Sequence, residues 1–272
     1  MKIIILASGS KGNATYIETE NTKILIDAGI SYLQIKNRLA QRNISFCDLD
    51  AILVTHDHID HIKYLASIAK KTNATIYLSE PTYHMINQKT SGSLNYLKSA
   101  IIYANYKYEI GDCIVAAMEL SHDVCCCFGY AIKEKREGNV TYGYITDTGY
   151  IPNQYLPLIS KLQVISIEAN HDVNMLKKSG RPWPLIQRIL SNQGHLSNIQ
   201  CINYLKELNY QYVKQIVLSH LSEECNTEEL AIREVMIAFD GEPPFELKVA
   251  KQDEPLEAVS YTHLTLPTTS RV

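Results

Sequence analysis

Short apolar runs separated by turn residues fill the N-terminal half of the chain. The first run, Lys2–Ala7, is followed by Ser8-Gly-Ser-Lys-Gly-Asn13, in which glycine and asparagine supply the positive φ angles that tight turns need. Short apolar runs bounded in this way are typical of strands. This pattern predicts strands at Lys2–Ala7, Ala14–Glu18, Lys23–Asp27, Ala51–Thr55, Thr75–Leu78, Asp112–Leu120, Phe128–Lys133, Val140–Thr146, Val164–Glu168 and Gln215–Ser219.

Apolar residues at helical spacing predict helices between these strands. One helix begins near Ser31, where Leu33, Ile35 and Leu39 are apolar. The others are expected at Ile62–Lys70, Gln154–Lys161, Leu185–Ser191, Asn198–Leu208 and Thr227–Phe239. The order is mainly β hairpins with helices between them, which predicts an α+β fold with two sheets face to face and helices outside.

The length of 272 residues, with 46% hydrophobic residues, is enough for a full core. We expect a single domain over residues 1–250 and a C-terminal tail over residues 251–272. From Ala258 the tail is rich in threonine and has no periodicity, and the segment from Ser260 resembles a translated sequencing adapter. About the last 15 residues are therefore expected to be non-native, and we leave them out of the fold prediction.

Charge, hydropathy and cysteine content bear on the cellular location of the protein and on its binding partners. A net charge of −3 gives no overall basic field, so local cations and metal ions would have to hold a nucleic acid. No apolar run approaches the ~20 residues of a membrane span, and Ile3–Ala7 is too short for a signal peptide. Seven cysteines, an odd number, fit a reducing compartment, and Cys125–Cys127 are expected to be buried or half-buried thiols. We expect a cytoplasmic protein without a membrane partner.

The segment His56-Asp-His-Ile-Asp-His61 concentrates metal-binding side chains in one short turn. Two histidines at positions i and i+2 of an extended segment point the same way, so His56 and His58 can share one metal ion. Asp60 and His61, at the expected start of a helix, can reach a second ion. The segment therefore predicts two adjacent metal sites.

Two metal ions need more ligands than these four residues supply. Three further candidates each follow an apolar run, which would deliver them to one edge of a sheet: His122, Asp147 and His220. Their shared position at strand ends favours a common site over three unrelated roles.

Together these seven residues resemble the pattern of the metallo-β-lactamase-fold hydrolases, over about residues 1–250. The resemblance implies a four-layer αββα sandwich with a dinuclear centre at one edge. It also implies ligand sets of His56, His58 and His122 for one metal, Asp60, His61 and His220 for the other, and Asp147 for both. Five histidines and two aspartates suit Zn²⁺, and the mixed nitrogen and oxygen set also admits Mn²⁺.

Further segments narrow the resemblance to the WalJ/YycJ-like branch of bacterial hydrolases. These segments are Ser8–Asn13, Ile24–Gly29, Ile167–Asp172, Gly194–Asn198 and Leu218–Ser222, of which the last two also echo RNase Z. This branch is similar to nucleases that cleave phosphodiesters, which implies a 5′–3′ exonuclease-like activity. DNA, rather than RNA, is then the expected partner.

The resemblance also gives roles to single residues. We expect a hydroxide that bridges the two metals to attack phosphorus, Asp60 to orient it, and His195 as imidazolium to protonate the leaving oxygen. Asn170 is a candidate substrate contact, and Glu168 could shape the same cleft. Two alternatives stay open: a thioester or other carbonyl hydrolase of the same fold, and a weakly catalytic regulatory or scaffold protein.

Overall fold

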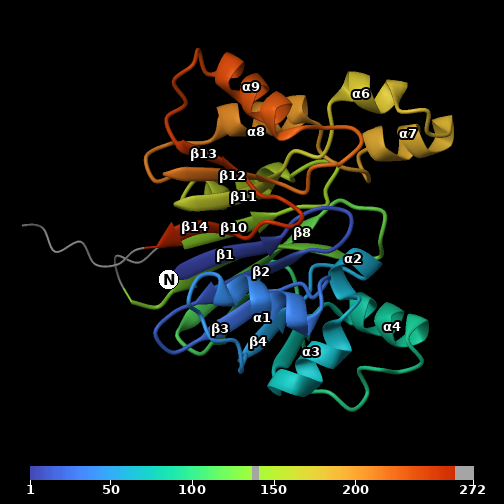
Figure 1. Ribbon diagram of the computed structural model, residues 1–272, viewed down its shortest axis with the longest axis vertical. Helices are drawn as coiled ribbons and strands as arrows, with labels where there is room; N and C mark the ends of the chain where they lie inside the picture. The colour runs from blue at the N-terminus through green and yellow to red at the C-terminus, as the bar shows by residue number, and fades with distance from the viewer. Residues whose placement is uncertain (137–140, 261–272) are drawn as a thin grey trace, which may run out of the picture.

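The computed structural model describes residues 1–136 and 141–260. Two seven-stranded sheets lie face to face, and helices cover the outer face of each sheet (Figure 1). Helices α1 (Tyr32–Ala40) and α3 (Leu65–Thr72) lie outside the first sheet, and α8 (Asn198–Glu207) and α9 (Glu228–Ala238) lie outside the second. The predicted four-layer αββα sandwich is confirmed.

The first sheet has the strand order β14-β1-β2-β3-β4-β5-β6. Its strands are β1 (Lys2–Ala7), β2 (Ala14–Glu18), β3 (Lys23–Ile26), β4 (Ala51–Leu53), β5 (Thr75–Leu78), β6 (Ser99–Ile101) and β14 (Leu256–Ser260). The strands from β14 to β3 pair antiparallel, and those from β3 to β6 pair parallel.

The second sheet, in the order β13-β12-β11-β10-β9-β8-β7, is mixed in the same way. Its strands are β7 (Lys107–Ile110), β8 (Cys113–Leu120), β9 (Cys127–Glu134), β10 (Thr141–Ile145), β11 (Val164–Glu168), β12 (Gln215–Ser219) and β13 (Glu246–Val249). The strands from β10 to β13 are parallel, so the expectation of mainly hairpins is wrong for this half. Parallel pairing brings the carboxyl ends of these strands to one edge, where sites commonly form.

Burial on both faces explains the unbroken apolar runs of the strands. In β1, Ile3 and Ile5 pack between the two sheets, whereas Ile4 and Leu6 pack toward the helices. All four side chains are fully buried, and each such burial contributes about 1.5–3 kcal/mol to the stability of the fold.

Two predicted helices are each divided. The chain after His58 forms α2 (Ile59–Ile62) and then α3, because the Tyr64 N–H donates to the carbonyl of Ala28 instead of continuing the helix. The expected helix at Gln154–Lys161 is a 3₁₀ turn at Asn153–Tyr155 followed by α5 (Leu156–Ile159), since Pro157 has no N–H to donate. The remaining helices are α4 (Glu80–Lys89), α6 (Val173–Lys178) and α7 (Trp183–Leu190).

The C-terminal part of the sheet reaches further than the sequence analysis expected. Strand β14 lies beyond residue 250 and pairs antiparallel with β1, so the expected tail contributes an edge strand. The residues predicted to be non-native are mostly 261–272, which lie outside the described residues. The expected start of β10, at Val140, lies outside them as well. Within the described ranges, no helix is long and apolar enough to cross a membrane.

Candidate metal centre

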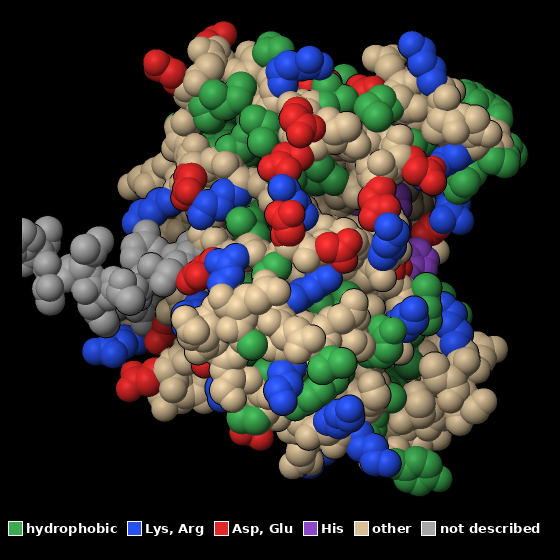
Figure 2. Space-filling model, in the orientation of Figure 1, with side chains coloured by type: hydrophobic (Ala, Val, Ile, Leu, Met, Phe, Trp, Pro, Cys, Tyr) green, Lys and Arg blue, Asp and Glu red, His purple; other side chains and the backbone are tan. Residues whose placement is uncertain are grey.

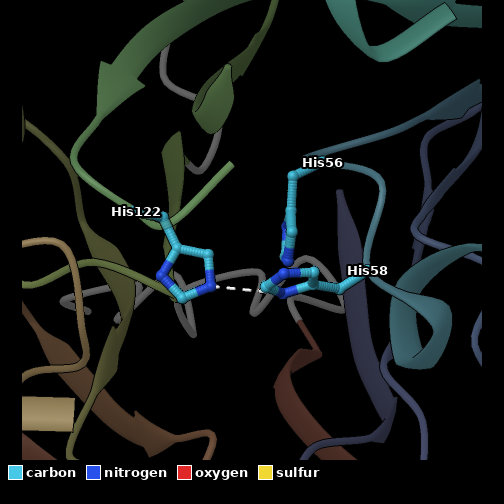
Figure 3. Close-up of side chains that lie close together, drawn as sticks. All are labelled: His56, His58 and His122. Atoms are coloured by element: carbon cyan, nitrogen blue, oxygen red, sulfur yellow. Dashed lines mark hydrogen bonds between the residues drawn. The ribbon is translucent and has the colours of Figure 1, made fainter. Parts of the chain in front are cut away.

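Three histidines from two loops meet at the edge of the sandwich. His56 and His58 follow β4, and His122 follows β8. Figure 3 shows the three rings close together, with Nδ1 of His58 3.3 Å from Nε2 of His122. Nε2 of His56 is buried without a hydrogen-bond partner among the described residues. One nitrogen of each ring lies within 4.8 Å of the other two, so the three could hold one cation.

A second group lies beside the first. Asp60 and His61 belong to α2, and His220 follows β12. Oδ2 of Asp60 lies 3.4 Å from Nε2 of His61 and 3.7 Å from Nε2 of His220. These three donors also lie within 4.8 Å of one another and could hold a second cation.

Asp147, which follows β10, lies between the two groups. Its Oδ2 is 3.3 Å from Nε2 of His61, and its Oδ1 is 3.5 Å from His220 Nε2 and 4.0 Å from His122 Nε2. The structure therefore brings together all seven residues that the sequence singled out as candidate ligands. It places Asp147 where one carboxylate could serve both groups.

Two of these residues have an unusual backbone conformation. Asp147 has φ of 58° and His220 has φ of 57°, in the left-handed region that costs a non-glycine residue about 1–3 kcal/mol. Hydrogen bonds hold this conformation at His220, whose N–H donates to Oγ of Ser8 at 2.7 Å. On its other side, the Asn170 amide donates to the His220 carbonyl at 2.9 Å.

Asp27, at the end of β3, holds the ring of His61. Its Oδ2 lies 2.7 Å from Nδ1 of His61, and its Oδ1 accepts from the N–H of Thr55 at 2.9 Å. Because Nδ1 of His61 is engaged by a carboxylate, Nε2 faces the group formed with Asp60 and His220. Carboxylates that orient ligating histidines in this way are common behind metal sites.

Glu168, the last residue of β11, holds two further imidazoles. Its Oε1 lies 2.8 Å from Nδ1 of His195 and 2.9 Å from Nδ1 of His220. Its Oε2 accepts the N–H groups of Thr148 and Leu196 at 3.0 and 3.1 Å. Although burial opposes ionisation, the neighbouring histidines keep the pKa of Glu168 below its usual range. An ionised carboxylate only accepts, so both histidines donate from Nδ1.

His195 lies at the mouth of the centre. Its ring centroid is 4.9 Å from that of His122 and 5.4 Å from that of His220, and 19% of its side chain is exposed. With Nδ1 committed to Glu168, its Nε2 is available to a bound molecule. Figure 2 shows histidine side chains in a hollow at the right-hand edge of the molecule.

Asn170 lies behind His220 rather than at the mouth. Its side chain donates to the His220 carbonyl, and its Oδ1 lies 3.3 Å from Nδ1 of His171. The residue is buried. Its contacts position His220, and the expected contact with substrate stays a prediction.

The electrostatics of the centre favour positive charge. Burial alone would lower the pKa of His220, yet nearby carboxylates, above all Asp147, raise it to about 10. Burial likewise opposes the charged form of His61, but Asp147, Asp27 and Asp60 raise its pKa well above the usual range. Divalent cations would satisfy the same carboxylates. Nε2 of His56 and Oδ2 of Asp147 are buried and have no hydrogen-bond partner in the part of the chain that the structure describes, and together with this charge pattern they fit metal ions.

Comparison with known proteins identifies the superfamily of the chain. A sequence profile of the Beta-lactamase superfamily domain matches residues 22–221. Exodeoxyribonuclease WalJ of Streptococcus pneumoniae is 38% identical over 231 residues, which cover 85% of each chain. The chain belongs to the metallo-β-lactamase superfamily. Within it, Exodeoxyribonuclease YycJ of Bacillus anthracis is 34% identical over 227 residues and 84% of each chain.

Solved structures show the same architecture. The metallo-β-lactamase fold protein YhfI from Bacillus subtilis has a TM-score of 0.70 at 17% identity, covering 94% of this chain and 98% of that chain. Unliganded yeast PDE1 has a TM-score of 0.71 at 14% identity, covering 94% and 99%. At these identities the likeness shows the fold alone, and it agrees with the superfamily assignment.

Asp27 had no role predicted from the sequence, and Glu168 was predicted only to shape the substrate cleft. Both are carboxylates that follow an apolar run, Lys23–Ile26 and Val164–Ile167. The same signal had pointed to Asp147. Applied to every strand, it would have found the residues that orient the histidines of this metallo-β-lactamase-superfamily site.

Proposed function

We propose that the protein is a metal-dependent phosphodiesterase that degrades DNA from an end, in the 5′–3′ direction. The observation that carries this proposal is that all seven candidate ligands converge in a chain that is 38% identical to an exodeoxyribonuclease. Retention of this full set argues against a scaffold that has lost catalysis. A DNA substrate also accords with the cytoplasmic location expected from the composition.

Two divalent ions, Zn²⁺ or Mn²⁺, would be held at this centre. We assign His56, His58 and His122 to one ion, Asp60, His61 and His220 to the other, and Asp147 to both. When bound, such ions lower the pKa of water and neutralise charge on a phosphoryl group. The predominance of imidazole among the donors favours Zn²⁺.

The acid–base work is assigned to His195 and Asp60. Glu168 accepts from Nδ1 of His195 and raises its pKa against the opposing effect of burial, so the imidazolium can donate a proton from Nε2 to the leaving oxygen. Asp60 lies between His61 and His220, with 19% of its side chain exposed, and orients the attacking water.

Metal removal and labelled substrates test this function. Protein stripped with a chelator and reloaded with Zn²⁺ or Mn²⁺ is incubated with 5′- and 3′-labelled single- and double-stranded DNA and RNA. We expect metal-dependent release of mononucleotides from DNA, with the label position giving the direction. Hydrolysis of a thioester, but of no phosphodiester, would instead favour the carbonyl hydrolase.

A pair of variants ties the activity to the site. His58→Ala should lose one bound metal and the nuclease activity. His84→Ala removes an exposed histidine of α4, whose side chain is 70% exposed, and should keep both. Equal activity of the two variants would contradict the assigned site.

A further inference from the structure

A cavity of about 400 Å³ opens beside the candidate metal centre, on the side of His58 and His122. It lies between the loop after β4, the end of α4 and the segment at residues 123–125. Gln193, from the loop after α7, closes another side. Apart from the candidate metal ligands His58 and His122, none of the lining residues has a role in the function proposed above.

Two cations on different helices bear on this cavity: Lys89 lines it, and Arg188 pairs with the lining residue Asp123. Lys89, the last residue of α4, binds the buried side chain of Asp57 and donates to its carbonyl at 3.1 Å. Nε of Arg188, on α7, lies 3.0 Å from Oδ2 of Asp123, and the two side chains form an ion pair. Figure 1 shows α4 and α7 at the same edge of the molecule, α4 in the half with the first sheet and α7 in the half with the second.

Both cations keep donors free for a ligand. An ammonium has three N–H groups, and Lys89 uses two of them for Asp57. A guanidinium has five, and Arg188 approaches Asp123 through Nε alone, as an ion pair. Within residues 1–136 and 141–260 neither has a further hydrogen bond. Nearly half of the Lys89 side chain and more than half of the Arg188 side chain are exposed.

The remaining lining is of mixed character. Met85, Val124 and Cys125 give an apolar side, and the Gln193 amide can donate and accept. An apolar surface beside a hydrogen-bonding amide suits a nucleobase, whereas the two cations suit a phosphate. The volume lies near the lower end of the ~300–1,000 Å³ of small-molecule pockets, which matches one nucleotide rather than a duplex.

We infer that this cavity binds one nucleotide of the strand being degraded, with Lys89 and Arg188 at its phosphate and Gln193 at its base. This inference rests on the proposed function and adds a specificity site to it. Holding one nucleotide beside the centre would set the position of cleavage along the strand. The cations contribute affinity without base preference, as phosphate contacts generally do.

Protection of Cys125 from alkylation tests the cavity without relying on turnover. Cys125 is exposed and lines the cavity, whereas Cys47 is exposed elsewhere and is the internal control. In metal-loaded protein, thymidine 5′-monophosphate should slow the reaction of Cys125 with iodoacetamide about tenfold and leave Cys47 unchanged. Inorganic phosphate, which lacks the base, should protect less. Equal rates for Cys125 with and without the nucleotide would overturn the inference.

Matched variants assign the protection to the cations. Lys89→Met should raise the nucleotide concentration needed for protection about tenfold, and Arg188→Gln should do the same. Lys70→Met, on α3, and Arg181→Gln, which breaks a similar pair with Glu224, should match the wild type. If the two pairs of variants respond alike, the cavity is not the phosphate site.

Kinetics separate this inference from the proposed function. With p-nitrophenyl thymidine 5′-monophosphate, Lys89→Met should lower kcat/KM about tenfold more than with bis-p-nitrophenyl phosphate, which has no nucleotide. An equal loss on both substrates would overturn the nucleotide site. If the wild type cleaves neither these substrates nor DNA with any metal, the proposed function fails, and Cys125 protection still decides whether the cavity binds a nucleotide.

Discussion

Oε1 of Glu168 lies 2.8 Å from Nδ1 of His195, and the same oxygen lies 2.9 Å from Nδ1 of His220. One buried carboxylate thus orients both a candidate metal ligand and the candidate acid. Glu168 is the last residue of the parallel strand β11. Two backbone N–H groups donate to its second oxygen and so fix the orientation of the carboxylate.

Glu168→Gln should weaken both functions of this residue. Glutamine has a single acceptor oxygen, so at least one of the four buried N–H groups loses its partner, at a cost of about 1–3 kcal/mol in unfolding free energy. We expect nuclease activity to fall about 10- to 100-fold. Urea unfolding and initial rates measure the two effects. The exposed Glu207→Gln is the control, and equal behaviour of both variants would contradict the orienting role.

Asp27→Asn should selectively weaken one of the two metal sites. Asparagine tolerates the left-handed backbone at this position, where φ is 61°, so the change acts mainly on Nδ1 of His61. We expect the affinity for one ion to fall about 10- to 100-fold while the other is unchanged. Competition with a chromophoric chelator reports the two affinities. Exposed Asp48→Asn should change neither, and a similar loss at both sites would contradict the ligand assignment.

The sequence predicted the buried parts of the fold well. Strands β1 and β2 match their expected bounds, because both faces of these strands are buried. In β1, Ile3 packs on one face and Ile4 on the other, which leaves an unbroken apolar run in the sequence. Strands β6, β7, β13 and β14 were not predicted. They lie at sheet edges, and β6, β7 and β13 are largely exposed or half-buried, so hydrophobic pattern does not mark them.

In the candidate site, too, some residues could be recognised from the sequence and others could not. The clustered histidines were recognisable within one hexapeptide, whereas Asp27 and Glu168 act through partners that are distant in sequence. Which imidazole each carboxylate contacts depends on parallel pairing of the strands, and the local pattern does not specify that pairing. Cys125 was expected to be at least half-buried and is exposed, because only Cys127 of the three cysteines lies within β9.

Gly29→Ala should displace the start of α2. A Cβ at this position would lie 1.7 Å from the carbonyl oxygen of Asp60 and 2.5 Å from the backbone nitrogen of Asn13. Since neither backbone atom can yield without moving its loop, we expect a loss of about 1–3 kcal/mol in unfolding free energy and lower metal occupancy.

Gly180→Ala is the matched control for this steric effect. Gly180 has φ of 73°, and no described atom lies within 4 Å of the position that an added methyl group would take, so alanine there introduces backbone strain without a clash. It should cost about 1–2 kcal/mol and leave the metal content unchanged. Metal analysis of both variants separates the causes, and full occupancy in Gly29→Ala would show that the close approach to Asp60 does not position this ligand.

His195→Ala should separate proton donation from metal binding. The side chain contacts Glu168 and lies outside the seven assigned ligands, so we expect both metals to remain. Loss of a general acid lowers the rate about 10²–10⁴-fold when the leaving group is an unactivated sugar oxygen. With bis-p-nitrophenyl phosphate the loss should be much smaller, since p-nitrophenolate leaves without a proton.

Comparison of the two substrates decides whether His195 donates the proton. A position-specific structural role would lower both rates by the same factor, because it would disturb the centre regardless of the leaving group. Acid catalysis lowers them by different factors and also removes the alkaline limb of the pH–rate profile on DNA. Rates on both substrates and metal content should therefore be measured on one preparation. A wild-type rate on DNA would exclude the acid role.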